Sequence, residues 1–127
     1  MQETHSESRQ SQRLLFSTKE AVTARIMKCE HPDADPIPVT ILNLSEGGLG
    51  LAMARNALQT VAEREEIRLV TIEGGTDLSF LIGIRMEVRW LLHNPEMQHA
   101  CLGCEFINPA SAVIQMIRNI FSAKTAG

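Results

Sequence analysis

The chain has 127 residues, of which 44% are apolar and 21% charged, and its net charge is -3. This length suits a single domain that buries its own core. The acidic balance argues against binding to nucleic acid polymers, because such modules are usually basic. No apolar run approaches the roughly 18 residues of a membrane-spanning helix, and the polar N-terminus lacks a signal-peptide core. We therefore expect a cytoplasmic protein without membrane insertion, and reduced cysteines.

The first half of the chain predicts a polar arm followed by three strands. Residues 1–14 contain little to bury and carry Arg9 and Arg13, so we expect a flexible N-terminal arm. The remaining residues, 15–123, are expected to form one folded unit. The three strands are predicted over residues 21–27, 38–44 and 49–54. In these segments apolar residues alternate with polar ones or form short runs between turn signals.

The second half predicts three more strands after a loop or single turn over residues 55–65. Residues 67–71 alternate, and Gly74-Gly75 marks a turn. Residues 80–92 place an apolar side chain at every second position, which predicts one long strand, bent or bulged near Gly83, with Trp90 in the core. A sixth strand over residues 99–107 turns four side chains to one side: Ala100, Leu102, Cys104 and Phe106.

A helix is predicted at the C-terminal end. Asn108-Pro109 is typical of a helix start, and an apolar stripe follows at helical spacing: Val113, Ile117, Ile120 and Phe121. Six strands in hairpin succession followed by one helix favour a mainly β fold. We expect a six-stranded antiparallel β-barrel with one C-terminal amphipathic α-helix and a flexible N-terminal arm.

The most informative stretch is the turn Asn43-Leu44-Ser45-Glu46-Gly47-Gly48, which joins two predicted strands. Asn43 and Ser45 stand two apart, so their side chains share a face in an extended segment. Gly48 lets the backbone approach whatever they hold. Arg9 and Arg13 add guanidinium groups, which bind phosphate oxygens and stack on purines. Together these residues would suit a compact, doubly charged nucleotide.

Taken together, these features resemble the PilZ domain, a bacterial receptor module for cyclic di-GMP. The resemblance rests on RQSQR (9–13), NLSEGGLGL (43–51), EVRW (87–90), GCEF (103–106) and the closing helix. It implies a six-stranded barrel with a C-terminal helix. It also implies that Arg9 and Arg13 hold the phosphates and guanines of cyclic di-GMP. Asn43, Ser45 and Gly48 would contact guanine edges and approach the ligand.

The sequence departs from the family pattern at two positions. Asn43 stands where many members carry aspartate, and Ser8 stands where some relatives carry another arginine. Both a single ligand molecule and a stacked dimer are compatible with this pattern. The resemblance implies a receptor, not an enzyme, that orders its arm on the ligand and regulates an effector protein in trans. Motility, exopolysaccharide synthesis and pilus function are the processes it implies.

Two other hypotheses stay open. The first is a PilZ-like interaction adaptor that binds no nucleotide, against which the arginine motif argues. The second is an enzyme that uses Ser45 as a nucleophile or Cys101 and Cys104 as a redox pair. Residues three apart on a strand face opposite sides, which disfavours that pair as a redox or metal site. We expect no metal, and we interpret the acidic loop of Glu30, Asp33 and Asp35 as solvated.

Overall fold

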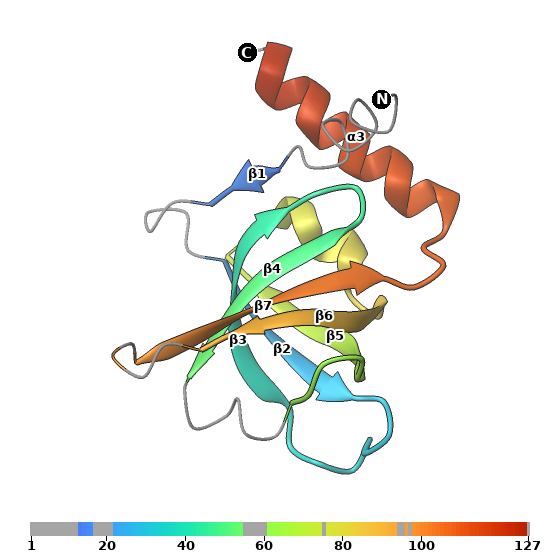
Figure 1. Ribbon diagram of the computed structural model, residues 1–127. Coiled ribbons are helices and arrows are strands. Elements are labelled where there is room, and N and C mark those ends of the chain that lie inside the picture. Colours follow the sequence, from blue (N-terminus) through green and yellow to red (C-terminus); the bar gives the residue numbers. More distant parts are fainter. Residues whose placement is uncertain are drawn as a thin grey trace, which may run out of the picture.

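The computed structural model describes residues 13–16, 22–54, 61–74, 76–93, 96 and 98–126. Seven strands, one 3-10 helix and one α-helix lie in these ranges (Figure 1). In chain order they are β1 (Leu14–Leu15), β2 (Val22–Lys28), β3 (Ile37–Leu44), β4 (Gly48–Ala54), β5 (Glu66–Glu73), η2 (Thr76–Leu81), β6 (Arg85–Leu92), β7 (His99–Phe106) and α3 (Ser111–Ala126).

Six of the described strands form a closed antiparallel barrel. Around the barrel the order is β2, β5, β6, β7, β4 and β3, and β3 pairs with β2 to complete the circle. Closure leaves these strands without the exposed edges that promote aggregation. Strand β1 pairs with the end of β3 beyond its pairing with β2. The predicted barrel and C-terminal helix are confirmed, and β1 is an addition that the sequence pattern did not reveal.

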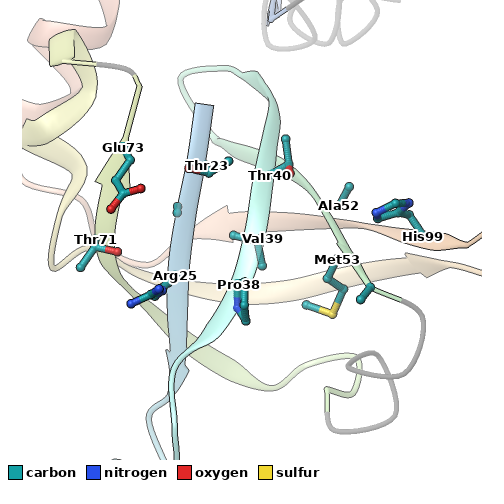
Figure 2. A pocket seen from close by; sticks show the side chains of 12 residues that line it. Thr23, Arg25, Pro38, Val39, Thr40, Ala52, Met53, Thr71, Glu73 and His99 are labelled. Carbon is teal, nitrogen blue, oxygen red and sulfur yellow. The ribbon is translucent and has the colours of Figure 1, made fainter. Parts of the chain in front are cut away.

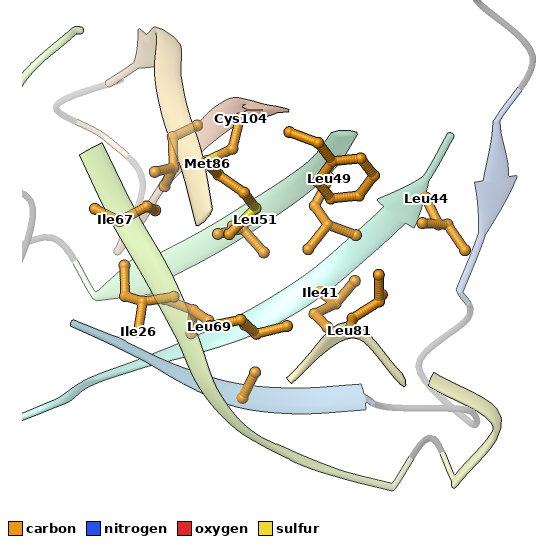
Figure 3. Close-up of a cluster of buried hydrophobic side chains, with 14 of the residues drawn as sticks. Ile26, Ile41, Leu44, Leu49, Leu51, Ile67, Leu69, Leu81, Met86 and Cys104 are labelled. Carbon is orange, nitrogen blue, oxygen red and sulfur yellow. The ribbon is translucent and has the colours of Figure 1, made fainter. Parts of the chain in front are cut away.

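The core fills the barrel with aliphatic side chains from every barrel strand (Figure 3). Inward positions alternate along the strands, as at Ile26 and Leu69, which are fully buried. The predicted inward face of β7 is confirmed, because Ala100, Leu102, Cys104 and Phe106 are all buried. Helix α3 lies at one end of the barrel (Figure 1). It buries Ile117 and packs the rest of its predicted stripe against the core.

The predicted long strand over residues 80–92 is wrong in two respects. Residues 76–81 form the 3-10 helix η2, which buries Leu78 and Leu81. Strand β6 begins only at Arg85, after a turn in which Gly83 has a φ of 95°. A bulge then interrupts the β6–β7 register between Val88 and Trp90, whereas we predicted it near Gly83. The bulge turns the indole outward, so Trp90 is not in the core.

The helix also begins later than predicted. Asn108 has a φ of 45°, which is a left-handed conformation and not the extended one of an N-cap residue. The first helical bonds instead run from the amides of Val113 and Ile114 to the carbonyl of Ala110. Asn108 and Pro109 therefore belong to the turn that leads from β7 into α3, which begins at Ser111.

Gly48 lies where β4 and β7 approach most closely. It pairs with Glu105, and a Cβ added at Gly48 would overlap the carbonyl oxygen of Cys104. Gly47, one residue earlier in the turn, has open space around the same position. From the sequence we predicted that Gly48 lets the backbone approach a ligand. In the barrel, its missing side chain first permits the approach of the neighbouring strand.

We predict that Gly48→Ala lowers the free energy of unfolding by about 3 kcal/mol, because backbone atoms must move to admit the methyl group. Gly47→Ala is the matched control and should stay within about 0.5 kcal/mol of the wild type. Urea unfolding of the three proteins measures both effects. Equal stability of the two variants would contradict the close approach of β4 and β7.

Cys104 is a core residue that titrates unusually. Its side chain is buried between β4 and β6, opposite Leu49 and Val88. Burial raises the pKa of the Cys104 thiol to about 12 from an ordinary value of 9.0, because the thiolate would lose its hydration. The thiol therefore stays protonated at neutral pH.

This raised pKa predicts a pH dependence of stability. Above pH 9 the unfolded state loses the Cys104 proton while the folded state keeps it, so stability falls as pH rises towards 12. The slope approaches about 1.4 kcal/mol per pH unit. Urea unfolding of the wild type and Cys104→Ala between pH 8 and pH 10.5 isolates this residue. We expect the difference between the two proteins to shift steadily above pH 9, and parallel profiles would refute the assignment.

Candidate functional site

Strand β1 brings Arg13 of the arginine motif to the predicted turn. Leu14 and Leu15 pair with Leu44 and Asn43, and the amide of Phe16 donates a hydrogen bond to the Leu42 carbonyl. This pairing sets Arg13 beside Asn43, and the Arg13 Nη1 donates to the Asn43 Oδ1 over 2.7 Å. Two residues that lie 30 positions apart in the sequence therefore meet at one place on the barrel surface.

The turn between β3 and β4 is held by Ser45. The Ser45 amide donates to the Gly48 carbonyl over 2.9 Å, and the Gly47 amide donates to the Ser45 Oγ over 3.3 Å. The hydroxyl is buried and also donates to the Gly48 carbonyl. The Gly47 carbonyl accepts a bond from the Phe106 amide, which ties the turn to β7. Ser45 thus fixes the shape of the turn through bonds within the chain itself.

A shelf runs across four strands beside this turn. Asn43 pairs with Gly50 on β4, Gly50 pairs with Gly103 on β7, and Gly103 pairs with Trp90 on β6. The Asn43 amide lies over Gly50, and the Trp90 indole lies over Gly103, so neither glycine could carry a Cβ without displacing these groups. An amide and an aromatic ring therefore border the shelf at opposite ends.

The bulge in β6 supplies the residues that sequence reasoning missed. Because the register shifts between Val88 and Trp90, Arg89 and Trp90 both face outward although they are consecutive. The Trp90 side chain is 45% exposed. Strict alternation along residues 80–92 concealed this change. Trp90 can lie on the surface because it pairs with Gly103, and a glycine on the facing strand leaves room for a large ring.

These groups border a hollow of about 250 Å³. Its lining includes Arg13, Ser45 and Gly48 from the prediction, together with Arg89, Trp90 and Glu105. Asn43 does not line the hollow; it holds Arg13, which does. Arg9 lies outside the described residues. The structure therefore brings the predicted turn together with one of the two predicted arginines.

Charge around the hollow is arranged in pairs. Arg89 Nη1 lies 3.1 Å from a carboxylate oxygen of Glu105 and 3.2 Å from one of Glu87. On the other side of the turn, Arg118 of α3 lies 3.1 Å from Glu46. Such exposed pairs contribute little stability. The pairs orient the side chains that form them. The pair of Arg118 and Glu46 also joins α3 to the turn that lines the hollow.

A larger hollow of about 580 Å³ lies elsewhere, on the outer face of the barrel across β5, β2, β3 and β4 (Figure 2). Its lining includes Arg25, Glu73 and His99 among small side chains such as Thr23 and Thr40. None of the predicted site residues that the structure describes lines it. We choose the smaller hollow as the candidate site because it gathers two guanidinium groups, an exposed indole and the tight turn.

The alternative chemistries gain no geometric support from the described residues. Cys104 faces the core, whereas Cys101 is partly exposed, so the two thiols do not face one another across β7. Among the residues that the structure describes, no group of three histidine, cysteine, aspartate or glutamate side chains is placed to hold a metal ion. No helix in the same ranges has the length and apolar character needed to span a bilayer.

Comparison with solved structures shows which folds the chain resembles. Escherichia coli YcgR in complex with c-di-GMP is 17% identical, with a TM-score of 0.64, covering 91% of this chain and 45% of that one. The Bacillus subtilis inhibitor of motility MotI (DgrA) is 15% identical, with a TM-score of 0.62 and coverages of 90% and 50%. The chain thus spans about half the length of these two proteins.

An isolated domain matches over nearly its full length. The PilZ domain of Escherichia coli YcgR with c-di-GMP is 14% identical, with a TM-score of 0.61, covering 91% of this chain and 90% of that one. At such identities the likeness shows the fold alone. No curated protein matches the sequence. The family model of the PilZ domain matches residues 7–123, nearly the whole chain, and the chain therefore belongs to the PilZ domain family.

Proposed function

We propose that this chain is a receptor for cyclic di-GMP that acts by binding and not by catalysis. The observation that carries the proposal is the bond from Arg13 to Asn43, which joins the arginine motif to the turn beside a hollow with an exposed indole. The c-di-GMP complex of the structurally similar YcgR supports this choice of ligand. The proposed contacts are made by Arg9, Arg13, Asn43, Ser45 and Gly48.

The arginines supply the charge that the ligand requires. Cyclic di-GMP carries two phosphodiester groups, and a guanidinium binds such oxygens through parallel hydrogen bonds. Asn43 accepts from one nitrogen of Arg13 and so orients the guanidinium before the ligand arrives. Such preorganisation reduces the ordering cost of binding. In this proposal Arg9 joins the site from the arm.

Trp90 adds a surface on which a guanine can stack. Its indole covers Gly103 and Trp90 is nearly half exposed, so part of the ring is open to a planar base. Stacking on an aromatic side chain stabilises a bound base by about 1–3 kcal/mol. We therefore include Trp90 among the ligand contacts, although sequence reasoning assigned it to the core.

The proposed output is a change of surface. Ligand binding would draw the part of the arm that precedes Arg13 against the barrel beside the turn, and Glu46 would connect that turn to α3 through Arg118. The composite surface would then regulate an effector protein in trans, in the cytoplasm, in motility, exopolysaccharide or pilus function. Recovery of an effector that depends on cyclic di-GMP, and is lost in Arg13→Ala, is the corresponding measurement.

We predict that Arg9→Ala and Arg13→Ala each weaken cyclic di-GMP binding by about tenfold to a hundredfold, because each removes charge-assisted hydrogen bonds. Calorimetric titration of the wild type and the variants measures this loss, with GTP as the comparison ligand. Arg25→Ala is the matched control, since Arg25 is an exposed arginine that lines the other hollow.

The same titration decides between the receptor and the adaptor. Micromolar or tighter binding of cyclic di-GMP, selective over GTP and sensitive to Arg13, supports the receptor and also gives the number of ligands bound. No heat change and no shift in melting temperature at high ligand concentration would refute it. The adaptor that binds no nucleotide would then be the better interpretation.

We predict that Trp90→Ala weakens cyclic di-GMP binding by about tenfold or more. Leu92→Ala is the matched control, because Leu92 is also exposed on β6 but does not line the hollow. The chain has one tryptophan and no tyrosine, so its fluorescence reports on Trp90 alone. Ligand should change that emission, and an unchanged spectrum at calorimetric saturation would show that the indole is not a contact.

A further inference from the structure

Glu105 is a charged residue of the hollow that the proposed contacts do not use. It is the one carboxylate that lines the hollow among the residues the structure describes. Its neighbours across the sheet are Gly48 on β4 and Glu87 on β6. Because its β4 partner Gly48 has no side chain, no side chain lies directly opposite Glu105 on that strand, and 56% of the Glu105 side chain is exposed.

Arg89 holds this carboxylate in place. The Arg89 Nη1 lies 3.1 Å from the Glu105 Oε1, and the bulge that turns Trp90 outward also directs Arg89 to the same side. Glu87 contacts the same nitrogen over 3.2 Å but does not line the hollow. Trp90, Arg89 and Glu105 therefore place an aromatic surface, a guanidinium and a carboxylate around one small space.

That set of groups matches the chemistry of guanine. Guanine carries hydrogens on N1 and on its 2-amino group, which a carboxylate can accept as a pair, and its O6 and N7 accept from a guanidinium. Adenine has a lone pair at N1 and no 2-amino group, so it would leave the carboxylate unpaired. The Asn43 side chain is neutral, and its oxygen already accepts from Arg13.

We infer that Glu105, oriented by Arg89, accepts the N1 and N2 hydrogens of a guanine and selects guanine over adenine in the bound dinucleotide. This assignment rests on the proposed receptor function and adds to it the residue that determines base specificity. A carboxylate near two phosphates would by itself repel the ligand. The guanidinium groups of Arg89 and Arg13, which both line the hollow, offset that charge, which lets the hollow hold both an acceptor and an anion.

Titrations with cyclic di-GMP and cyclic di-AMP test the assignment. We expect Glu105→Gln to lower the ratio of cyclic di-GMP to cyclic di-AMP affinity by about tenfold or more, because it replaces one acceptor oxygen with a donor. Glu87→Gln is the matched control and should leave the ratio within about twofold, since Glu87 touches Arg89 without lining the hollow. Melting temperatures of both variants verify that the fold is intact.

Each other outcome separates this inference from the receptor proposal. Equal weakening of both dinucleotides by Glu105→Gln would show that Glu105 only positions Arg89, and equal strengthening would show simple repulsion; both results overturn the assignment while the receptor stands. A wild type that binds cyclic di-GMP, with an unchanged ratio in Glu105→Gln, also overturns the assignment alone. A wild type that binds neither dinucleotide overturns the receptor proposal itself.

Discussion

The absence of side chains at glycines on two neighbouring strands, β4 and β7, is the constraint on which the candidate site depends. Gly48 lets β4 approach the Cys104 carbonyl of β7, and Gly103 leaves room for the indole of Trp90. At a position with a Cβ, the strands would move apart or the ring would leave the surface. One steric requirement therefore closes the barrel and shapes the shelf. Stability and binding cannot vary independently at these glycines.

The bulge in β6 places two consecutive side chains on the outer face of the barrel. A regular strand alternates its side chains between core and solvent, so Arg89 and Trp90 would lie on opposite faces. The extra residue puts both outside while Val88 stays buried. Beyond the bulge, Leu91 takes the partly buried place next to the core. The barrel thus keeps its core and gains two adjacent functional groups on its surface.

Sequence patterns predicted the parts of this protein that local chemistry determines. The alternation in β2 and β7, the polar turn at 43–48 and the stripe of α3 all follow from residue types at short spacing, and the structure agrees. The bulge was predicted at the wrong position and the 3-10 helix η2 was missed, because pairing with β7 and packing of Leu78 and Leu81 determine them. Such contacts are non-local, so a period-2 pattern alone began the strand too early, at residue 80 and not at Arg85.

The same division applies to the candidate site. Spacing alone singled out Arg13, Asn43, Ser45 and Gly48, but it could not assign them different tasks. In the structure Ser45 and Gly48 build the turn and close the barrel, while Asn43 orients Arg13. Some residues of one motif can therefore be required for folding, while others are required for ligand binding. Loss of affinity in a Ser45 or Gly48 variant would have to be separated from loss of the turn. Arg13, Trp90 and Glu105 are exposed, so variants at these positions test the proposed contacts without that complication.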